Sequence, residues 1–297
     1  MELTTQPEPI RPNQVDWKRV RRCTFVVHQR FTYEYPAPIR DLRHRLVVIP
    51  PATFGEQRRT SHQLDVSQAA EVITNTDAFA NTVVEVRVPV VERTIEFEVC
   101  VGIERSGPPA ARLLAGSWLD DPRVTSPSER TSPDRDLAQA AGELAGQGAH
   151  GLELAELANA WVYRSMAYGF GATDVHTTAG QALAGGRGVC QDYAHVMIAI
   201  CRLLGLPALY VSGHLLGEGG THAWVEVLLP AADGSGRAEA WALDPTHGRR
   251  AGMSYVAVAV GSDYGDVAPA SGSYRAACRG SLSARKRVFL TEVAYVD

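Results

Sequence analysis

The spacing of the hydrophobic residues in this chain changes between residues 106 and 135. From Val20 to about Ile103, apolar and polar residues alternate and β-branched residues are frequent, which is typical of strands with one buried face and one solvated face. The segments that join these strands, such as 50–55 and 74–77, carry turn residues at intervals too short for helical crossovers. This part of the chain is therefore predicted to fold as a β-sandwich.

The sequence favours two domains joined by a linker. With 297 residues, of which 45% are hydrophobic, the chain is long enough to build two cores. Residues 106–135 are loaded with Pro, Ser, Asp and Arg, which predicts a linker that lies over the surface. We therefore expect a flexible tail over 1–19, a β-rich domain over 20–105, this linker, and a second domain over 136–297.

The second domain is expected to mix helices with strands. Ala, Leu and Glu recur at helical spacing early in it, and a later apolar stripe is ended by a Gly and a Pro, so helices are predicted over 137–146, 152–166 and 190–204. Alternating segments then predict strands over 209–213, 221–229, 238–243, 254–260 and 287–296. The fold class expected for the whole chain is α+β.

Charge and cysteine usage exclude several classes of protein. The formal charge of −4 comes from 33 acidic and 29 basic residues mixed along the chain, so neither a nucleic-acid partner nor a membrane surface is expected. Residues 1–17 lack the pattern of a signal peptide, and no run approaches ~18 apolar residues, so a soluble, cytoplasmic protein is expected. An odd number of cysteines without Cys-x-x-Cys spacing disfavours a disulfide framework and a zinc site; they are Cys23, Cys100, Cys190, Cys201 and Cys278.

One of these cysteines stands at the start of a predicted helix, in the segment Gly-Arg-Gly-Val-Cys-Gln-Asp-Tyr-Ala-His over 186–195. Free backbone N–H groups and the helix dipole stabilise a thiolate at that position. Gly186 and Gly188 let a substrate carbonyl approach, and the N–H of Cys190 can donate to an oxyanion. A buried structural cysteine is the alternative for Cys190 considered alone.

An imidazole and a carboxylate follow at the ends of two neighbouring predicted strands. His222 begins one strand, and Asp244 ends the next, just before a proline. A hairpin pairing of these strands would bring the carboxylate beside the imidazole, which could then take the proton of Cys190. Taken singly, His222 could be a surface histidine and Asp244 a turn former. Together the three side chains predict a nucleophilic acyl-transfer site.

Five further polar or aromatic residues lie near this constellation. Asp192 is predicted to complement the helix dipole in the first turn, and His195 to be a structural histidine in the core. Trp224 should face the same side of its strand as the imidazole and shield it from water. His214 and His247 are placed in loops that could border the cleft.

Three segments carry a family resemblance. Gly188-Val-Cys-Gln-Asp-Tyr-Ala-His, Thr221-His-Ala-Trp-Val-Glu-Val and Asp244-Pro-Thr resemble motifs of the transglutaminase-like superfamily of papain-related thiol enzymes. The strand from His28 to Tyr33 and the segment over 255–269 are similar to those of its bacterial branch, in which a β-rich region precedes the core. The resemblance spans roughly residues 20–297.

The resemblance implies a papain-like core in which the helix that bears the cysteine packs on an antiparallel sheet. It implies Cys190 as nucleophile, His222 as base and Asp244 as the orienting carboxylate, with no metal and no organic cofactor. Some eukaryotic relatives need calcium, but this chain shows no acidic loop with calcium-ligand spacing. Papain-related enzymes place an oxyanion-hole Gln shortly before the cysteine; Gln181 does not stand at that spacing, so Tyr168 is considered as the second donor.

The resulting functional hypothesis is a thiol-dependent acyl-transfer enzyme that acts on amide bonds through a thioester. Its substrate would be a peptide or protein, or a small amide. Hydrolysis by a protease or amidase is favoured over transamidation of protein glutamine, because no second-substrate feature is evident in the sequence. The same fold could also serve a biosynthetic amide-forming enzyme or a non-catalytic binding module.

Overall fold

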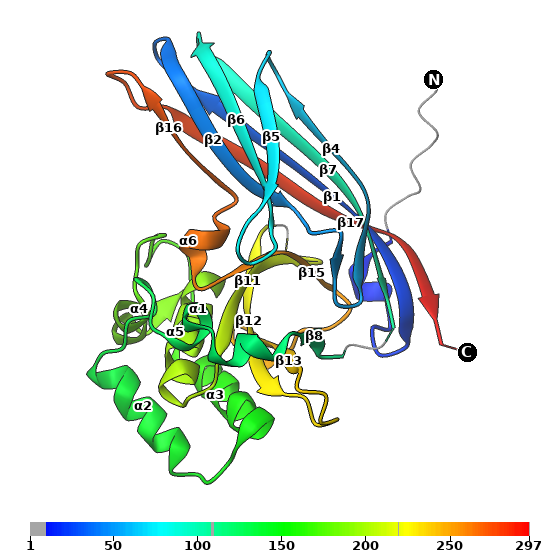
Figure 1. The fold of residues 1–297 in the computed structure, drawn as a ribbon. Coiled ribbons are helices and arrows are strands. Elements are labelled where there is room, and N and C mark those ends of the chain that lie inside the picture. Colours follow the sequence, from blue (N-terminus) through cyan, green and yellow to red (C-terminus); the bar gives the residue numbers. More distant parts are fainter. Residues whose placement is uncertain (1–9, 108–109, 219, 297) are drawn as a thin grey trace.

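The computed structural model describes residues 10–107, 110–218 and 220–296. A sandwich of long strands lies beside a unit of helices and shorter strands, as Figure 1 shows. A short 3-10 helix, η1 (Pro12–Gln14), precedes the first strand. The α+β class and the N-terminal β-sandwich predicted from the sequence are both confirmed.

The sandwich consists of two antiparallel sheets. The first sheet contains, in spatial order, β17 (Ser281–Tyr295), β1 (Val20–Glu34), β7 (Thr94–Ser106), β4 (Gln57–Val66) and β3 (Thr53–Phe54). The second sheet contains β16 (Ala270–Arg275), β2 (Ile39–Ile49), β6 (Thr82–Val91) and β5 (Glu71–Thr76). Alternate side chains of β1 and β7, including Phe25, Phe31 and Phe97, are fully buried between the sheets, as the period-two pattern predicts.

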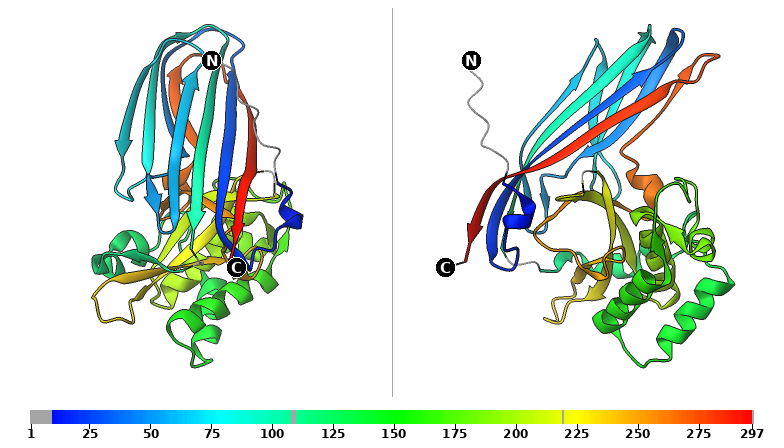
Figure 2. Two further views of the ribbon diagram at one scale, coloured as in Figure 1. Left: turned by 90° about the vertical axis from the view of Figure 1, so that its right-hand side faces the viewer. Right: turned by 180° about the vertical axis from the view of Figure 1, so that it is seen from behind.

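The C-terminal strands differ from the predicted domain division. Residues 136–297 were expected to form the second domain, but β17 pairs antiparallel with β1 from Val20 opposite Tyr295 to Glu34 opposite Ser281. β16 likewise pairs with β2. Figure 2 shows β17 lying beside β1 along the sandwich. The hydrophobic pattern identifies a strand but not its partner, so the return of the chain to the first domain could not be deduced from alternation alone.

The predicted linker also contains structure. It includes β8 (Arg112–Leu114), η2 (Gly116–Asp120) and α1 (Pro122–Thr125), and β8 pairs with β13 (Ala238–Asp244), a strand of the core sheet. The Val124 side chain is fully buried. The segment over 106–135 is therefore partly an element of the core, because its few apolar residues are enough to anchor it there.

The α+β core packs helices on a predominantly antiparallel sheet. The sheet contains, in spatial order, β14 (Arg249–Arg250), β13 (Ala238–Asp244), β12 (His222–Pro230), β11 (Ala208–Leu215) and β15 (Tyr255–Gly261). The helices are α2 (Arg135–Ala145), α3 (Gly151–Ser165), α4 (Ala179–Gly185), α5 (Cys190–Leu203) and α6 (Tyr264–Val267). A small parallel pair joins β9 (Ala167–Tyr168) to β10 (Arg187–Gly188). No helix in the described ranges is long and apolar enough to cross a membrane.

Helix α5 lies at the centre of this core. Its residues from Tyr193 to Arg202 are all buried, so the helix is enclosed on every side and not only along one stripe. It ends where Gly205 adopts a φ of 71°, a conformation that glycine tolerates best. The fixed position of α5 places Cys190, its first residue, at the edge of the packed core.

Two amides of the sandwich close the free edge of the core sheet. Gln57 donates to the carbonyl of Ala257 at 2.7 Å and accepts from its N–H at 2.9 Å. Asn81 does the same with Val260, at 2.7 Å and 2.8 Å. Strand β15 thus finds side-chain partners where a neighbouring strand would otherwise be needed, which fixes the two domains against each other.

Candidate active site

The thiol of the site lies at the first residue of α5. Cys190 is half-buried and packs against the core cluster, while its helix presents free N–H groups at this end. The parallel pairing of β9 with β10 sets Tyr168 opposite Gly188, two residues before the cysteine. The turn that leads to Cys190 is therefore held on both sides, by a helix and by a short pair of strands.

A buried carboxylate supports this turn. Asp192 is fully buried, and its Oδ2 accepts hydrogen bonds from the Val189 N–H at 2.7 Å and from the Thr173 hydroxyl at 2.6 Å. Burial raises the pKa of Asp192, and these hydrogen bonds oppose that rise. A Cβ on Gly188 would lie 2.6 Å from the carboxylate, so glycine is required for this close approach. Asp192 stands in the first turn, as the sequence predicts.

The imidazole begins β12 and is almost completely buried. The Nε2 of His222 lies 2.8 Å from Oδ2 of Asp244, and its Nδ1 lies 3.3 Å from Oε2 of Glu218. Burial alone would lower the pKa of His222, but hydrogen bonds to Asp244 and to the Cys190 thiol raise it to about 10. The imidazole therefore interacts with both other residues of the predicted constellation, Asp244 and Cys190.

The carboxylate of Asp244 ends β13 and is completely buried. The antiparallel pairing that sets Val225 opposite Leu243 brings it beside the imidazole, as expected for a hairpin. Its Oδ2 also accepts a hydrogen bond from the Tyr255 hydroxyl at 2.6 Å. Burial would raise the pKa of Asp244, but its hydrogen bonds to the imidazoles and the phenol hold that pKa well below its usual range.

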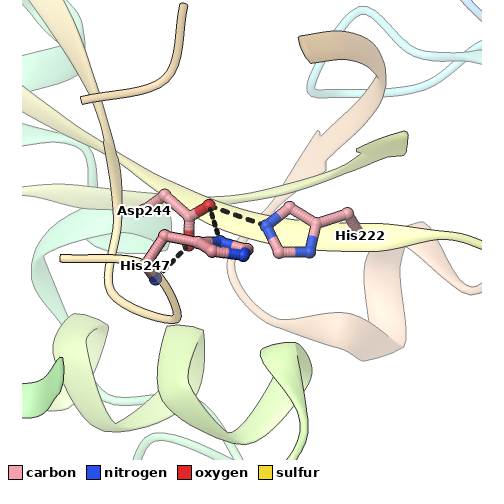
Figure 3. A group of neighbouring side chains, drawn as sticks. All are labelled: His222, Asp244 and His247. Atoms are coloured by element: carbon pink, nitrogen blue, oxygen red, sulfur yellow. Dashed lines mark hydrogen bonds and ion pairs between the residues drawn. The ribbon is translucent and has the colours of Figure 1, made fainter. Parts of the chain in front are cut away.

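A second imidazole completes the group drawn in Figure 3. The Nδ1 of His247 lies 2.8 Å from Oδ2 of Asp244, and ligand atoms of His222, Asp244 and His247 all lie within 4.8 Å of one another. Three such groups can hold a metal ion. Here the same atoms hydrogen-bond to one another, so a metal ion would have to replace the bonds that orient His222.

Two residues of this network were missed by the sequence analysis. Glu218 bridges the imidazoles, with Oε1 2.8 Å from Nε2 of His247. Tyr255 was recognised only as part of a strand, and its pKa is raised strongly by burial beside Asp244. A glutamate four residues before a candidate histidine is a weak signal, and the contact of β15 with the end of β13 depends on the sheet order.

The structure agrees with the predictions for Trp224 and His195 but not with that for His214. The Trp224 ring is buried and stacks at 6.2 Å from the His222 ring, as expected for a shielding role. His195 is fully buried in the core, as predicted, and its Nε2 accepts from the Tyr264 N–H at 3.2 Å, while its Nδ1 has no hydrogen-bond partner among the described residues; burial lowers its pKa to about 3. His214 was expected in a loop at the cleft, but it lies within β11 and is 1% exposed. Alternation through a short strand does not reveal that both faces are buried.

The network opens on one side into a cleft of about 750 Å³. Aromatic side chains, Met166 and three polar side chains line it, and the polar ones are Glu218, Thr246 and His247. Tyr168 lies in its wall, and burial, Cys190 and Glu218 raise its pKa. The cleft therefore reaches Glu218 and His247, which both belong to the network, whereas Asp244 is completely buried.

A thiol at a helix N-terminus, facing an imidazole that a buried carboxylate orients on an antiparallel sheet, defines a papain-like α+β architecture. Family models agree with this. Residues 138–244 match the transglutaminase-like superfamily and residues 25–104 match the bacterial transglutaminase-like N-terminal region. The chain thus carries a transglutaminase-like core preceded by a bacterial transglutaminase-like N-terminal region.

Relatives and a solved structure extend the match over most of the chain. An uncharacterized protein of Mycobacterium leprae, ML0607, is 29% identical over 91% of this chain and 98% of its own length. The uncharacterized protein Rv2569c of Mycobacterium tuberculosis is 27% identical over 75% of this chain and 79% of its own. A crystal structure of a candidate cysteine protease from Cytophaga hutchinsonii is 18% identical, covers 93% of both chains and superposes with a TM-score of 0.72. The shared fold thus includes both domains.

Proposed function

We propose that this protein is a thiol-dependent acyl-transfer enzyme that hydrolyses amide bonds in a peptide, a protein or a small amide. Cys190 is the nucleophile, His222 the proton carrier and Asp244 the orienting carboxylate. The observation that carries the proposal is that the His222 imidazole interacts with both Asp244 and Cys190. Its Nε2 bonds to Asp244 at 2.8 Å, and a hydrogen bond to the Cys190 thiol helps to raise its pKa.

The reaction proceeds in two steps. The Cys190 sulfur attacks the amide carbon, the C–N bond breaks, and the leaving amine takes its proton from His222, which leaves a thioester. Water then attacks the thioester, gives a proton to His222, and breaks the C–S bond to release a carboxylic acid. The N–H of Cys190, at the N-terminal end of α5, is the first candidate donor to the oxyanion of both steps, and the Tyr168 hydroxyl is the second.

Water is favoured as the acyl acceptor by the exposure of the cleft. Tyr168 is 48% exposed and Phe170 is 82% exposed at its mouth, so an acyl-enzyme there would stand open to solvent. A transamidase needs water kept away from the thioester while an amine enters. Transamidation and biosynthetic amide formation are distinguished from hydrolysis by the fate of an added amine.

The test is ammonia and amine release from a panel of peptide amides and glutamine-containing peptides, with and without added amines. The protein should release the amine and form the free acid, and Cys190→Ala should be folded and inactive. Product that contains the added amine in place of the acid would identify a transamidase. Equal activity of the protein and of Cys190→Ala would refute the proposed mechanism.

Thiol labelling provides a matched comparison within the same chain. Near neutral pH, an electrophile should modify Cys190 faster than the exposed Cys100, although Cys190 is the less accessible of the two. Cys201 is fully buried, and burial raises its pKa to about 12, so it should not react. Equal rates at Cys190 and Cys100 would indicate a binding module in place of an enzyme.

A further inference from the structure

The cleft beside Cys190 combines aromatic rings with a single carboxylate. Four of its lining residues are aromatic, namely Tyr163, Tyr168, Phe170 and Tyr193. Among the described residues that line it there is no lysine or arginine, and Glu218 is the one acidic residue. Such a surface is complementary to a ligand that carries positive charge on an apolar stem.

The aromatic residues are unusually exposed for their size. Phe170 is 82% exposed, Tyr163 is 50% exposed, and Tyr168 meets Phe170 edge to face at 5.6 Å. Exposed aromatic side chains that lie together at one cleft are typical of a binding surface, whereas single exposed side chains are common on any protein. Their ring faces attract an ammonium or guanidinium group, and their edges cover its methylene stem.

Glu218 is available to such a group. Its side chain is 38% exposed at the cleft, and its carboxylate contacts only the two imidazoles, at 2.8 Å from His247 and 3.3 Å from His222, among the ion pairs of the described residues. A carboxylate in this position has unused acceptor capacity that faces the open side. A neutral or acidic substrate would leave that capacity unsatisfied or would be repelled.

We propose that the acyl-donor substrate carries a cationic group close to its scissile amide, and that Glu218 together with the aromatic wall of the cleft binds it. This rests on the proposed acyl-transfer function of Cys190. The cation belongs to the donor because an attacking amine must first lose its proton, and a carboxylate partner favours the charged form. Glu218 would therefore hold an acceptor amine in its unreactive state, but it imposes no such penalty on a cation that takes no part in the reaction.

The test uses short peptidyl fluoromethyl ketones, which label a cysteine thiol irrespective of the natural acceptor. The probes differ in one side chain, lysine, norleucine or glutamate, placed first or second from the reactive carbonyl, each with a free or an acetylated N-terminus. Labelling of Cys190 by the best lysine probe should be about 10-fold faster than by its norleucine match, as expected for a charge-assisted contact. The glutamate probe should be the slowest. If the norleucine probe with a free N-terminus labels Cys190 as fast as the lysine probe does, the terminal ammonium is the cation.

Variants of the protein test the cation site separately from the acyl-transfer function. Glu218→Gln should reduce the lysine-to-norleucine ratio toward one, whereas Glu143→Gln, an exposed helix glutamate bonded to Gln139, should leave the ratio unchanged. The cation site alone would be overturned if the lysine-to-norleucine ratio did not change in Glu218→Gln. It would also be overturned if the three side chains gave equal rates while Cys190 still reacted faster than Cys100. If no probe labels Cys190 faster than Cys100, the acyl-transfer function itself fails, and the cation site with it.

Discussion

The two sides of the His222 ring lie in contrasting surroundings. On the Nε2 side, Asp244 is completely buried and bonded to His222, His247 and Tyr255. Toward the cleft, Nδ1 lies 3.3 Å from the partly exposed Glu218, and the ring also hydrogen-bonds to the half-buried Cys190. The buried side fixes the orientation of the ring, and the other, open side places it beside the half-buried thiol and the cleft residue Glu218.

The difference between the two sides of the ring explains how one imidazole can be both rigidly oriented and reactive. Hydrogen bonds to a buried charge are strong and costly to break, so the ring does not need its open side for support. The open side is then free to exchange a proton with the thiol or with a leaving amine. Substitutions on the two sides should therefore separate stability from reactivity.

The largest effect is expected from Asp244→Asn, which retains shape but removes the charge of the buried side. His222, His247 and Tyr255 would compete for an amide that donates as well as accepts. Loss of the orienting carboxylate should lower kcat by about 10⁴-fold. Removing one partner of a buried ion pair should also cost about 3–5 kcal/mol of unfolding free energy. Amine release and urea unfolding measure the two quantities.

Asp233→Asn is the matched control. Asp233 lies in an exposed loop and pairs with Arg237, so the same substitution should change neither activity nor stability measurably. Activity in Asp244→Asn within 10-fold of the parent protein would show that the buried side does not orient the imidazole.

The parts of the site that local patterns describe were predicted, and the parts that sheet order creates were not. The first residue of a helix and the ends of two hairpin strands are local features, so the sequence could place Cys190 at the start of α5 and Asp244 beside His222, 2.8 Å from its Nε2. Tyr255 reaches Asp244 because β15 lies in the same sheet, two strands beyond β12. Nothing in the alternation of a strand specifies its neighbours, so this contact could not be predicted from the pattern alone.

The same limit explains which strands of the sandwich were not predicted from the sequence. Alternation identified β1, β2, β6 and β7 of the sandwich, but β4, β5 and β16 were not predicted and β17 was predicted too short. Residues 74–77, predicted as a joining turn, lie largely within β5. β4 carries mostly polar residues because much of it faces solvent, and its alternation is correspondingly weak. β17 begins at Ser281 with exposed residues, so its apolar pattern became visible only from about residue 287. Partners distant in sequence complete both strands.

The next largest effect is a pH dependence of stability that originates at His222. Burial opposes protonation, but hydrogen bonds to Asp244 and Cys190 raise the pKa of His222 to about 10, above the ordinary value near 6.5. A raised pKa in the folded state contributes stability in full below about pH 6.5, and this contribution is lost as the pH rises through about 10. The unfolding free energy of the protein minus that of His222→Gln should therefore fall by on the order of a few kcal/mol across this window.

Denaturant unfolding of both proteins between pH 6 and pH 10.5 measures this difference. Lys286, whose pKa burial lowers to about 8, titrates in the same window, but it is common to both proteins and cancels in the subtraction. A difference that does not change with pH would mean that His222 is not held in its charged form.

A smaller effect is expected from Tyr255→Phe, which removes one hydrogen bond from the buried side. The hydroxyl donates to Asp244 at 2.6 Å and accepts from Arg249 at 3.0 Å. Its loss should cost about 1.5–3 kcal/mol, the range for a hydrogen bond to a charged group. Tyr274→Phe in the sandwich removes bonds only to the main chain and should cost about 1 kcal/mol. Thermal or urea unfolding compares the two; equal costs would show that the charge of Asp244 adds nothing to this contact.

The smallest effect on stability, and the sharpest separation of the two sides, is expected from Phe170→Ala on the open side. Its ring is 82% exposed, so truncation removes little buried area and should change the unfolding free energy by no more than about 0.5 kcal/mol. Because the ring stands in the wall of the cleft, Cys190 labelling by peptidyl probes should nevertheless become slower by about 3–10-fold, the range for loss of one aromatic contact. Leu282→Ala, a 52% exposed residue of β17, should alter neither quantity. If Phe170→Ala lowered stability as much as Tyr255→Phe, or left the labelling rate unchanged, the open side would be a structural surface and not the place where substrate binds.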